Sequence, residues 1–377
     1  MTSVAILSRA AGPPWADGSI NTHVAWARAL PDIDFRFFGS SSWRPTEANF
    51  RASRSGAADN TWGTAQKLRF VTWLARTRAD LFHLAFYPQP ATLQMLRPLF
   101  AVKRRPLVQT VQAAFAPSTE VAPLLVSRNI VAVSGRIARE LEAAVPGLDV
   151  TVVYPAVERS LLAEADGDAT RRMALLRGLG VGEGRRALLY AGNWSQRLGV
   201  GEALEVFAAV ARDVDDVDLV VANRLSLRGT HAEEEVLVRA AFDARVRELG
   251  IGSRVHVVGL LPDFRGVIAA SSALLFPALD LREGKLDVPL VVLEALALGV
   301  PVGLYDIAPL DEFAFAAAGA VAPSGDRTSL AGMLVALLSD PVAHGRAGAA
   351  GRALAADQFD PASRAPLLRA VYERALS

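Results

Sequence analysis

Two rounds of alternation between short apolar runs and amphipathic stretches constrain the fold of this chain more than any other feature of its sequence. The apolar runs have the length of buried strands, and the stretches between them carry apolar residues at steps of three and four, as a helix with one buried face does. Strands that alternate with helices in this way build βαβ units and a parallel sheet. In the first half the pattern predicts strands at Val4–Leu7, Asp34–Phe38, Leu81–Leu84, Leu107–Thr110, Asn129–Val133 and Thr151–Tyr154, and helices at His23–Leu30, Ala65–Arg76, Pro90–Leu96 and Gly135–Ala144.

The alternation starts again after a polar, glycine-containing stretch between Ala163 and Arg186. The second round predicts strands at Ala187–Ala191, Val217–Ala222, Val255–Val258, Ala273–Phe276, Val302–Leu304 and Ala320–Val321, and helices at Gly201–Arg212, Glu233–Leu249, Leu290–Leu298 and Ser329–Leu338. The chain has 377 residues, more than the ~250–300 that one hydrophobic core usually serves. We therefore expect an α/β protein with two Rossmann-like domains, at residues 1–160 and 187–357, a linker region at 161–186, and a C-terminal helix at 358–377 that crosses back to the first domain.

Charge and cysteine content exclude several classes of function. Lys and Arg total 40 against 39 for Asp and Glu, so nothing in the balance points to nucleic acid as a partner. The chain has no cysteine, which excludes disulfides, thiolate metal sites and cysteine nucleophiles and favours an intracellular protein. The N-terminal residues lack the pattern of a secretory signal, and no apolar run reaches the ~18–20 residues of a membrane span. We expect a cytoplasmic protein.

The predicted strand Ala187–Ala191 leads into a loop, GNWSQRLGVGEAL, that precedes a helix. Parallel sheets bind ligands beyond the carboxyl ends of their strands, where the free N–H groups of helix N-termini attract phosphate. Gly192 and Gly199 would let the backbone approach a diphosphate, and Arg197 would pair with its oxygens. Alternatively, the loop is an ordinary glycine-rich turn and Arg197 is solvated.

A second candidate site is the carboxylate of Glu294, in an otherwise apolar predicted helix within EGKLDVPLVVLEALALGVPVG. A carboxylate in such surroundings needs hydrogen-bond donors to compensate its lost hydration. The two hydroxyls of a ribose would serve, and so would a neighbouring arginine; the spacing favours neither.

Four segments of the second half together resemble the donor-binding half of the retaining family 4 glycosyltransferases. They are LLYAGNWSQRLGVGEAL, VHVVGLLPDFRGVIAASSALLFPAL, VPLVVLEALALGVPVG and AVAPSGDRTSLAGMLVALLSDP. The first half resembles the family more loosely, in GSINTHVAWARAL, RADLFHL, IVAVSGRIARELE and VTVVYPAVE. The resemblance implies a GT-B fold, in which an acceptor-binding N-terminal domain and a donor-binding C-terminal domain face each other across a cleft.

The resemblance also implies an activity. A hexose would pass from a nucleotide-diphosphate donor, a UDP-sugar before a GDP-sugar, to a hydroxyl of a small-molecule or glycan acceptor, with retained configuration. No metal or other cofactor is implied as a requirement, since helix dipoles and basic side chains can carry the diphosphate charge. The alternative is a nucleotide-sugar-binding protein, or a partner-dependent subunit, without activity of its own. A dinucleotide-dependent oxidoreductase is disfavoured because neither candidate first turn contains G-x-G-x-x-G.

The site residues that the resemblance implies depart from the family in part. The second acid of its paired-glutamate motif falls on Glu294, which implies ribose binding, but the first acid falls on Leu286. The family's phosphate-binding arginine and lysine correspond to Asn193 and Leu198, so we take Arg197 as their best substitute. The predicted donor-binding residues are Gly192, Asn193, Arg197, Arg224, Lys285, Asp287, Val288, Pro289, Leu290 and Glu294, and the predicted catalytic residues are His83, Arg197 and Lys285.

The first half contributes candidates for the acceptor side of the cleft, namely Gly18, Ser19, His23 and His83. A lone histidine is more often structural, and no histidine spacing indicates a metal site. The stretch from Lys67 to Arg78 is basic and amphipathic; we weigh peripheral membrane contact against packing on the chain's own sheet and favour packing. Trp43 and Trp62 are candidates for stacking on an acceptor. The sequence predicts no oligomeric state.

Overall fold

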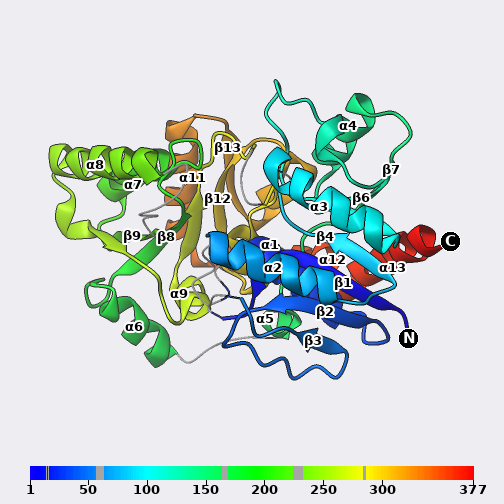
Figure 1. The fold of residues 1–377 in the computed structure, drawn as a ribbon. Helices are drawn as coiled ribbons and strands as arrows, with labels where there is room; N and C mark the ends of the chain where they lie inside the picture. Colours follow the sequence, from blue (N-terminus) through cyan, green and yellow to red (C-terminus); the bar gives the residue numbers. More distant parts are fainter. Residues whose placement is uncertain are drawn as a thin grey trace. The chain divides into compact units, whose positions relative to one another are not determined.

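The computed structural model describes residues 1–13, 15, 17–56, 63–87, 89–163, 169–223, 232–282 and 286–377. The chain forms two compact α/β units (Figure 1). Unit 1 comprises Met1–Arg159, Arg282–Leu290 and Gln358–Ser377, and unit 2 comprises Ser160–Leu281 and Val291–Asp357. The C-terminal helix thus belongs to unit 1, together with a short segment from the middle of the second half of the sequence.

Unit 1 is built on a parallel sheet of seven strands in the order β3-β2-β1-β4-β5-β6-β7. The strands are β1 (Ser3–Ala11), β2 (Asp34–Gly39), β3 (Phe50–Ala52), β4 (Leu81–Leu84), β5 (Leu107–Val111), β6 (Asn129–Ala132) and β7 (Asp149–Val152), and the helices are α1 (Gly18–Arg28), α2 (Thr64–Arg76), α3 (Pro90–Lys103), α4 (Gly135–Ala144) and α13 (Pro361–Leu376), with a short 3-10 turn η1 (Ala122–Leu124). Right-handed crossovers put α1 on one face of the sheet and α2, α3 and α4 on the other. Helix α13 packs on α1 and on β4, β5 and β6.

Side chains at alternate positions of β2 contact the helices on the two faces of the sheet. Phe35 contacts Tyr372 of α13, with ring centroids 6.4 Å apart, whereas Phe38 contacts Phe70 of α2 at 5.3 Å. The sheet is therefore covered on both faces, and this explains why its central strands read as continuous apolar runs rather than as alternating ones.

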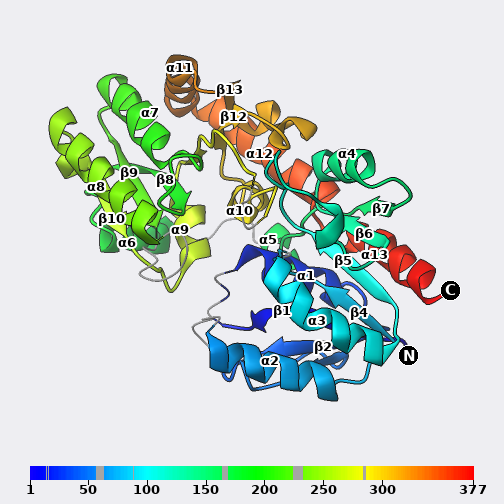
Figure 2. The same cartoon turned by 45° about the horizontal axis from the view of Figure 1, so that its top comes forward.

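Unit 2 repeats the plan with six strands in the order β10-β9-β8-β11-β12-β13. Its strands are β8 (Arg186–Gly192), β9 (Val217–Asn223), β10 (Val255–Val258), β11 (Ala273–Phe276), β12 (Val302–Asp306) and β13 (Gly319–Pro323). Its helices are α5 (Arg159–Ala163, from Ser160 on), α6 (Ala169–Gly178), α7 (Val200–Asp213), α8 (Ala232–Leu249), α9 (Phe264–Ala270), α10 (Leu290–Ala297, from Val291 on), α11 (Arg327–Ser339) and α12 (Pro341–Gln358), and 3-10 turns are η2 (Gly252–Arg254), η3 (Leu310–Glu312) and η4 (Phe315–Ala318). Helix α7 contacts α8, α11, β8 and β9 (Figure 2).

Several helices begin at residues that cap them. The side chain of Asp17 accepts a hydrogen bond from the N–H of Ser19 at the start of α1, and Ser134, Asp263, Asp326 and Asp360 cap α4, α9, α11 and α13 in the same way. A capped N-terminus satisfies donors that have no partner inside the helix. The cap at Asp17 explains why α1 starts five residues before the predicted His23.

Most predicted strands and helices are confirmed to within a few residues, and the α/β fold class is confirmed. The pattern missed the edge strand β3, the short helices α5 and α9, and the helix α12. Helix α3 runs through Pro98 to Lys103, although the pattern predicted its end at Leu96. A proline inside a helix removes one hydrogen bond, and here the packing of Leu96 and Phe100, both buried, favours continuing the helix.

Both sheets reverse their strand order at one place. In unit 1 the chain moves outward from β1 to β3 and then returns to add β4 on the other side of β1; unit 2 does the same at β8 and β11. At such a switch point the loops after the two central strands leave on opposite sides and open a crevice at the carboxyl edge of the sheet. The β1/β4 and β8/β11 edges are therefore where each unit is expected to bind a ligand.

Candidate functional site

In unit 2 the loop between β8 and α7 meets the loop after β11 at the switch point. The backbone carbonyl of Arg197 accepts hydrogen bonds from the N–H groups of Leu279 at 2.7 Å and Asp280 at 3.1 Å. Its guanidinium lies 3.9 Å from the carboxylate of Asp280. The backbone of Arg197 is thus fixed, while its side chain stays nearly half exposed at the carboxyl edge of the sheet.

Gly199 is required at the end of this loop by geometry. It has a left-handed backbone with φ +82°, and a Cβ atom there would lie 2.0 Å from the carbonyl oxygen of Pro277. Gly199 also stands at the N-cap of α7 with no side-chain hydrogen bond. The residue at the N-cap therefore provides no capping side chain for the first amides of α7. These amides, and the positive end of the helix dipole, are available to an anion.

The ends of β8 and β9 are tied together beside this loop. Gly192 pairs in register with Asn223, whose side-chain oxygen accepts a hydrogen bond from the Gly192 N–H at 2.8 Å. Asn193 follows, partly buried, and its carbonyl accepts from the N–H of Ser195 at 2.9 Å. Neither residue carries a charge, so among the predicted donor residues of this loop Arg197 alone can pair with a phosphate by charge.

Glu294 lies on α10 and is 7% exposed. The Nε of Arg265, on α9, donates to its Oε1 at 3.3 Å. The structure thus contains the ion pair that the sequence left open as an alternative. A carboxylate accepts several hydrogen bonds, so this pair does not preclude ribose hydroxyls as further donors.

A charged cluster that the sequence analysis missed supports the start of α7. Glu202 lies in the first turn of the helix, where its carboxylate accepts from the Nε of Arg327 at 2.8 Å and from the hydroxyl of Tyr305 at 2.9 Å. The hydrogen bond from Arg327 lowers the pKa of Glu202. Because Arg327 offsets the carboxylate charge, Glu202 does not cancel the attraction of the helix end for an anion.

In unit 1 the predicted donor residue Asp287 lies in a buried ion pair. Its carboxylate has no exposed surface; it pairs with the guanidinium of Arg136 and accepts from the hydroxyl of Ser134 at 2.5 Å. Its backbone N–H donates to the carbonyl of Gln112 at 2.7 Å. These contacts join the segment Arg282–Leu290 to the carboxyl ends of β5 and β6, and they favour a structural role for Asp287 over contact with a donor sugar.

The residues that follow Asp287 are also largely buried. Val288 has no exposed surface, Leu290 is 9% exposed, and Pro289 between them is partly exposed. The Cβ of Leu290 lies 3.2 Å from the place where a side chain at Gly18 would begin, so Gly18 lets these two segments pack closely. Ser19 is buried, and its hydroxyl donates to Asp17 at 2.6 Å.

His23 and His83 form a buried polar network rather than two separate sites. The Nε2 atoms of both rings lie within hydrogen-bond distance of the Thr110 hydroxyl, at 3.2 Å from His23 and 2.6 Å from His83. The Nδ1 of His23 lies 2.7 Å from the carbonyl of Ser19, and the Nδ1 of His83 lies 2.8 Å from the hydroxyl of Tyr372. The network links α1, β4, β5 and α13 across one face of the sheet.

Only one arrangement of protons satisfies this network with both rings neutral. A carbonyl can only accept, so Nδ1 of His23 carries its proton and Nε2 accepts from Thr110. Thr110 has one proton, so it accepts in turn from Nε2–H of His83, whose Nδ1 accepts from Tyr372. Burial lowers the pKa of His23 to about 4 and the pKa of His83 well below its usual value, which agrees with two neutral rings. This placement favours a structural role for both histidines, and the catalytic role predicted for His83 stays an unsupported prediction.

Two predicted site residues, Arg224 and Lys285, lie outside the described residues, as does Trp62. Trp43 is 4% exposed and packs against Phe37 and Phe50, so its ring serves the core. Among the described residues there is no group of three or more histidine and acidic side chains placed to hold a metal ion. A search of the same residues finds no helix with both the length and the apolar character that a membrane span requires.

Comparison with known proteins gives matches to glycosyltransferases. Residues 185–340 match the family model described as glycosyl transferases group 1, whereas no curated protein matches the chain. Among solved structures, HepE from Anabaena in complex with UDP and glucose has a TM-score of 0.75 at 14% identity, over 99% of this chain and 100% of that one. Sucrose-phosphate synthase from Thermosynechococcus elongatus has a TM-score of 0.73 at 18% identity, over 99% of each chain. An α,α-trehalose-phosphate synthase (UDP-forming) from Burkholderia vietnamiensis has a TM-score of 0.72 at 13% identity, over 100% and 97%.

The order of the two parallel sheets and these structural matches define the class of protein: the fold is that of the GT-B glycosyltransferases, with two Rossmann-like units. Within this fold, residues 185–340 match the family of group 1 glycosyl transferases. This confirms the resemblance inferred from the sequence, except for the assignment to the retaining family 4, which stays a prediction. The cleft expected between the two domains also stays a prediction.

Proposed function

We propose that this chain is a glycosyltransferase that takes a UDP-hexose as its donor, binds the donor on unit 2, and transfers the hexose to an acceptor hydroxyl with retained configuration. The observation that carries the donor site is the β8–α7 loop. It combines a switch point, a helix N-terminus without a capping side chain, and Arg197 on a fixed backbone. Those features suit a diphosphate. UDP is favoured because HepE, of similar fold, is described in complex with UDP and glucose, and a second similar protein is described as UDP-forming.

Each donor-binding residue has a distinct part in this proposal. The first amides of α7 bring backbone N–H groups to the diphosphate, Gly192 lets the diphosphate come close to the backbone, and Arg197 adds a positive charge. Glu294 accepts hydrogen bonds from the ribose diol, while Arg265 donates to its Oε1. Unit 1 would hold the acceptor.

The reaction exchanges one C–O bond for another. The bond between the anomeric carbon and the diphosphate oxygen breaks with its electron pair going to the diphosphate, and the acceptor oxygen forms the new bond. The acceptor proton passes to the departing phosphate, so no side-chain base is required. Negative charge accumulates on the leaving group, and preorganised donors around it should lower the barrier most.

A panel of nucleotides tests the donor. We expect UDP, rather than GDP, ADP, CDP or TDP, to give the largest rise in melting temperature, growing with concentration; a ligand at 100 times its Kd stabilises by about 2.7 kcal/mol. A protein that no nucleotide stabilises, even at millimolar concentration, would contradict the proposal.

A second candidate is a nucleotide-sugar-binding protein without turnover. Asn193 and Leu198 stand where the family has cations, and Leu286, which is 7% exposed, stands where it has an acid. Release of UDP from a UDP-hexose, with and without acceptors, separates the two. Affinity without any release would favour the binding protein, whereas turnover that Arg197→Ala abolishes would favour the transferase.

A further inference from the structure

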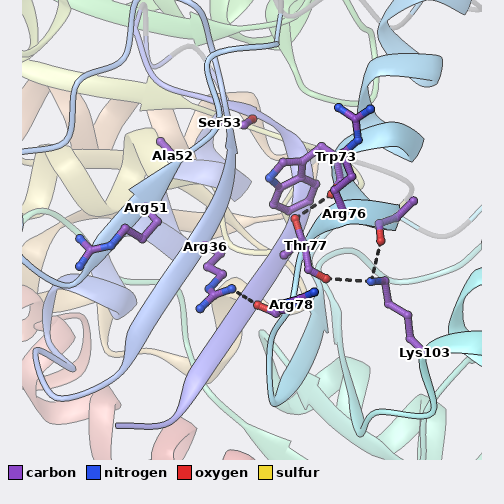
Figure 3. A pocket seen from close by; sticks show the side chains of 10 residues that line it. Arg36, Arg51, Ala52, Ser53, Trp73, Arg76, Thr77, Arg78 and Lys103 are labelled. Carbon is purple, nitrogen blue, oxygen red and sulfur yellow. Dashed lines mark hydrogen bonds between the residues drawn. The ribbon is translucent and has the colours of Figure 1, made fainter.

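Unit 1 contains a pocket of about 770 Å³ that the proposed transfer reaction does not use. Ten residues line it, and half of them are cations: Arg36, Arg51, Arg76, Arg78 and Lys103. Figure 3 shows the indole of Trp73 at its centre, with Arg36 and Arg51 on one side and Arg76, Arg78 and Lys103 on the other. No carboxylate is among the lining residues.

The pocket lies away from the edge of the sheet that binds ligands in such folds. Arg36 and Arg51 are partners in the register of β2 and β3, and they face the side of the sheet that α2 covers. The end of α2, with Trp73 and Arg76, leads through Thr77 and Arg78 toward the first residue of β4, which makes this the amino edge. The buried pair of Asp287 and the start of α1 are at the carboxyl edge. An occupant of this pocket therefore binds at a second site.

Some of the cations have partners that hold them in place. Lys103 donates to the carbonyls of Ala75 at 3.1 Å and Thr77 at 2.8 Å, and Arg36 donates to the carbonyl of Arg78. These bonds cover the carbonyls at the end of α2, whose partial negative charge would otherwise repel an anion. Asp34 pairs with Arg36 at 3.2 Å and lies 3.8 Å from Arg51, which offsets only one of the five charges.

Two cations are not committed to any partner. Arg76 and Arg78 are exposed, and within the described part of the chain their side chains make no hydrogen bond and no ion pair. Partial burial lowers the pKa of Lys103, because its ammonium has lost part of its hydration. Nearby positive charges repel one another, and a multiply charged anion relieves that repulsion.

The sequence that carries α2 and α3 adds few acids to these cations. Between Asn60 and Thr119 the only acidic residue is Asp80, whose carboxylate accepts hydrogen bonds from the N–H and hydroxyl of Ser3. The same stretch has eight cations, at positions 67, 69, 76, 78, 97, 103, 104 and 105. The segment that carries α2 and α3 is therefore strongly positive, although the chain as a whole has a net charge of only +1.

We propose that this pocket binds a phosphate-bearing ligand, with Arg76 and Arg78 as its main contacts and Trp73 as its apolar wall. Guanidinium groups bind phosphate oxygens in pairs, and the volume suits a diphosphate or a phosphate ester with an attached polar group. The phosphate can come from a soluble ester or from the headgroup of an anionic lipid. The site is independent of the donor site on unit 2.

The intrinsic fluorescence of Trp73 tests the proposal at low ionic strength, where charge pairs are least screened. The wild-type protein is titrated with pyrophosphate and, separately, with vesicles of phosphatidylglycerol or of phosphatidylcholine. The double variant Arg76→Glu/Arg78→Glu should weaken binding at least about tenfold. The matched control Arg139→Glu, at an exposed position on α4, should leave it unchanged. Trp73→Phe should remove the signal and so assign it to the pocket, and thermal melting should show that each variant is folded.

The possible outcomes distinguish a soluble phosphate ester, a lipid headgroup and the absence of a binding site. A Trp73 response to pyrophosphate that the double variant loses supports a site for soluble phosphate esters. A response to phosphatidylglycerol vesicles alone, lost in the same variant, supports a lipid headgroup. Absence of any Trp73 response to either probe, or equal losses in Arg139→Glu and the double variant, would overturn the proposal.

Discussion

The neutral histidine network of unit 1 predicts that the protein loses stability in mild acid. His23 has a pKa of about 4 in the folded chain against 6.5 for an ordinary histidine, because burial penalises its charged form. Between pH 6.5 and pH 4 the unfolded chain therefore binds a proton that the folded chain excludes. The stabilising effect is complete above pH 6.5 and is lost as the pH falls toward 4.

The magnitude follows from the size of the shift. Each pKa unit corresponds to about 1.36 kcal/mol, so lowering the pH from 6.5 to 5 should remove about 2 kcal/mol through His23 alone. The pKa of His83 is lowered well below its usual value, also mainly by burial, and its contribution has the same sign. Typical domains are stable by only about 5–15 kcal/mol, so the loss is large enough to measure.

Urea unfolding at pH 7.5, 6 and 5, followed by tryptophan fluorescence, measures this loss. The control is the double variant His23→Gln/His83→Gln, which shares every carboxylate with the wild type. The variant should be less stable at pH 7.5, and its stability should change less between pH 7.5 and pH 5, by about 2 kcal/mol or more. If the wild type loses less than about 1 kcal/mol over this range, or the variant loses as much as the wild type, the neutral network is refuted.

Two further substitutions test the packing around the site. Asp287→Ala leaves Arg136 buried without its partner and should cost about 3–5 kcal/mol in urea unfolding; a loss under about 1 kcal/mol would show that the pair is solvated. Gly199→Ala puts a Cβ 2.0 Å from the carbonyl oxygen of Pro277 at a positive φ, so it should destabilise the protein by more than about 1 kcal/mol and weaken nucleotide binding. Gly201→Ala, two residues further on with no atom within 4 Å of the new Cβ, should be neutral or stabilising, and equal effects of the two would contradict the close approach at Gly199.

The fold could be predicted from the sequence because buried parallel strands leave a strong local pattern. The strands Leu81–Leu84, Val255–Val258 and Ala273–Phe276 begin and end as predicted. Strand β3 was missed because it has only three residues at the edge of its sheet, where one row of hydrogen bonds and little burial leave no apolar run. Helix α9 was missed because it has only seven residues, too few for a helical period to show.

The candidate site could be predicted only where the residues that form it lie close together in the sequence. The loop that contains Arg197 and Gly199 could be found because glycines and a cation stand between a strand and a helix. The partner of Asp287 could not be found, since Arg136 is 151 positions away and only the fold brings the two together. The same holds for Glu202 and Arg327, which are 125 positions apart.

The histidines illustrate the opposite case. His83 ends a strand near the ligand edge, and this position alone suggested a catalytic role. The side chains of alternate strand residues point to opposite faces, and that of His83 points under α13, toward Tyr372, which is 289 positions away in the sequence. A residue can thus stand next to a site in sequence while its side chain serves the core.

The binding of UDP to the wild type and to Glu294→Ala, measured by calorimetry, tests the central claim most directly. Hydrogen bonds to a charged group contribute about 1.5–3 kcal/mol, so losing those from the ribose should weaken UDP binding at least about tenfold. Glu294→Gln, which keeps the shape of the side chain, should lose less than Glu294→Ala. The account predicts measurable UDP binding that falls in this order, and it would be contradicted by a wild type that does not bind UDP or by a Glu294→Ala variant that binds UDP as tightly as the wild type.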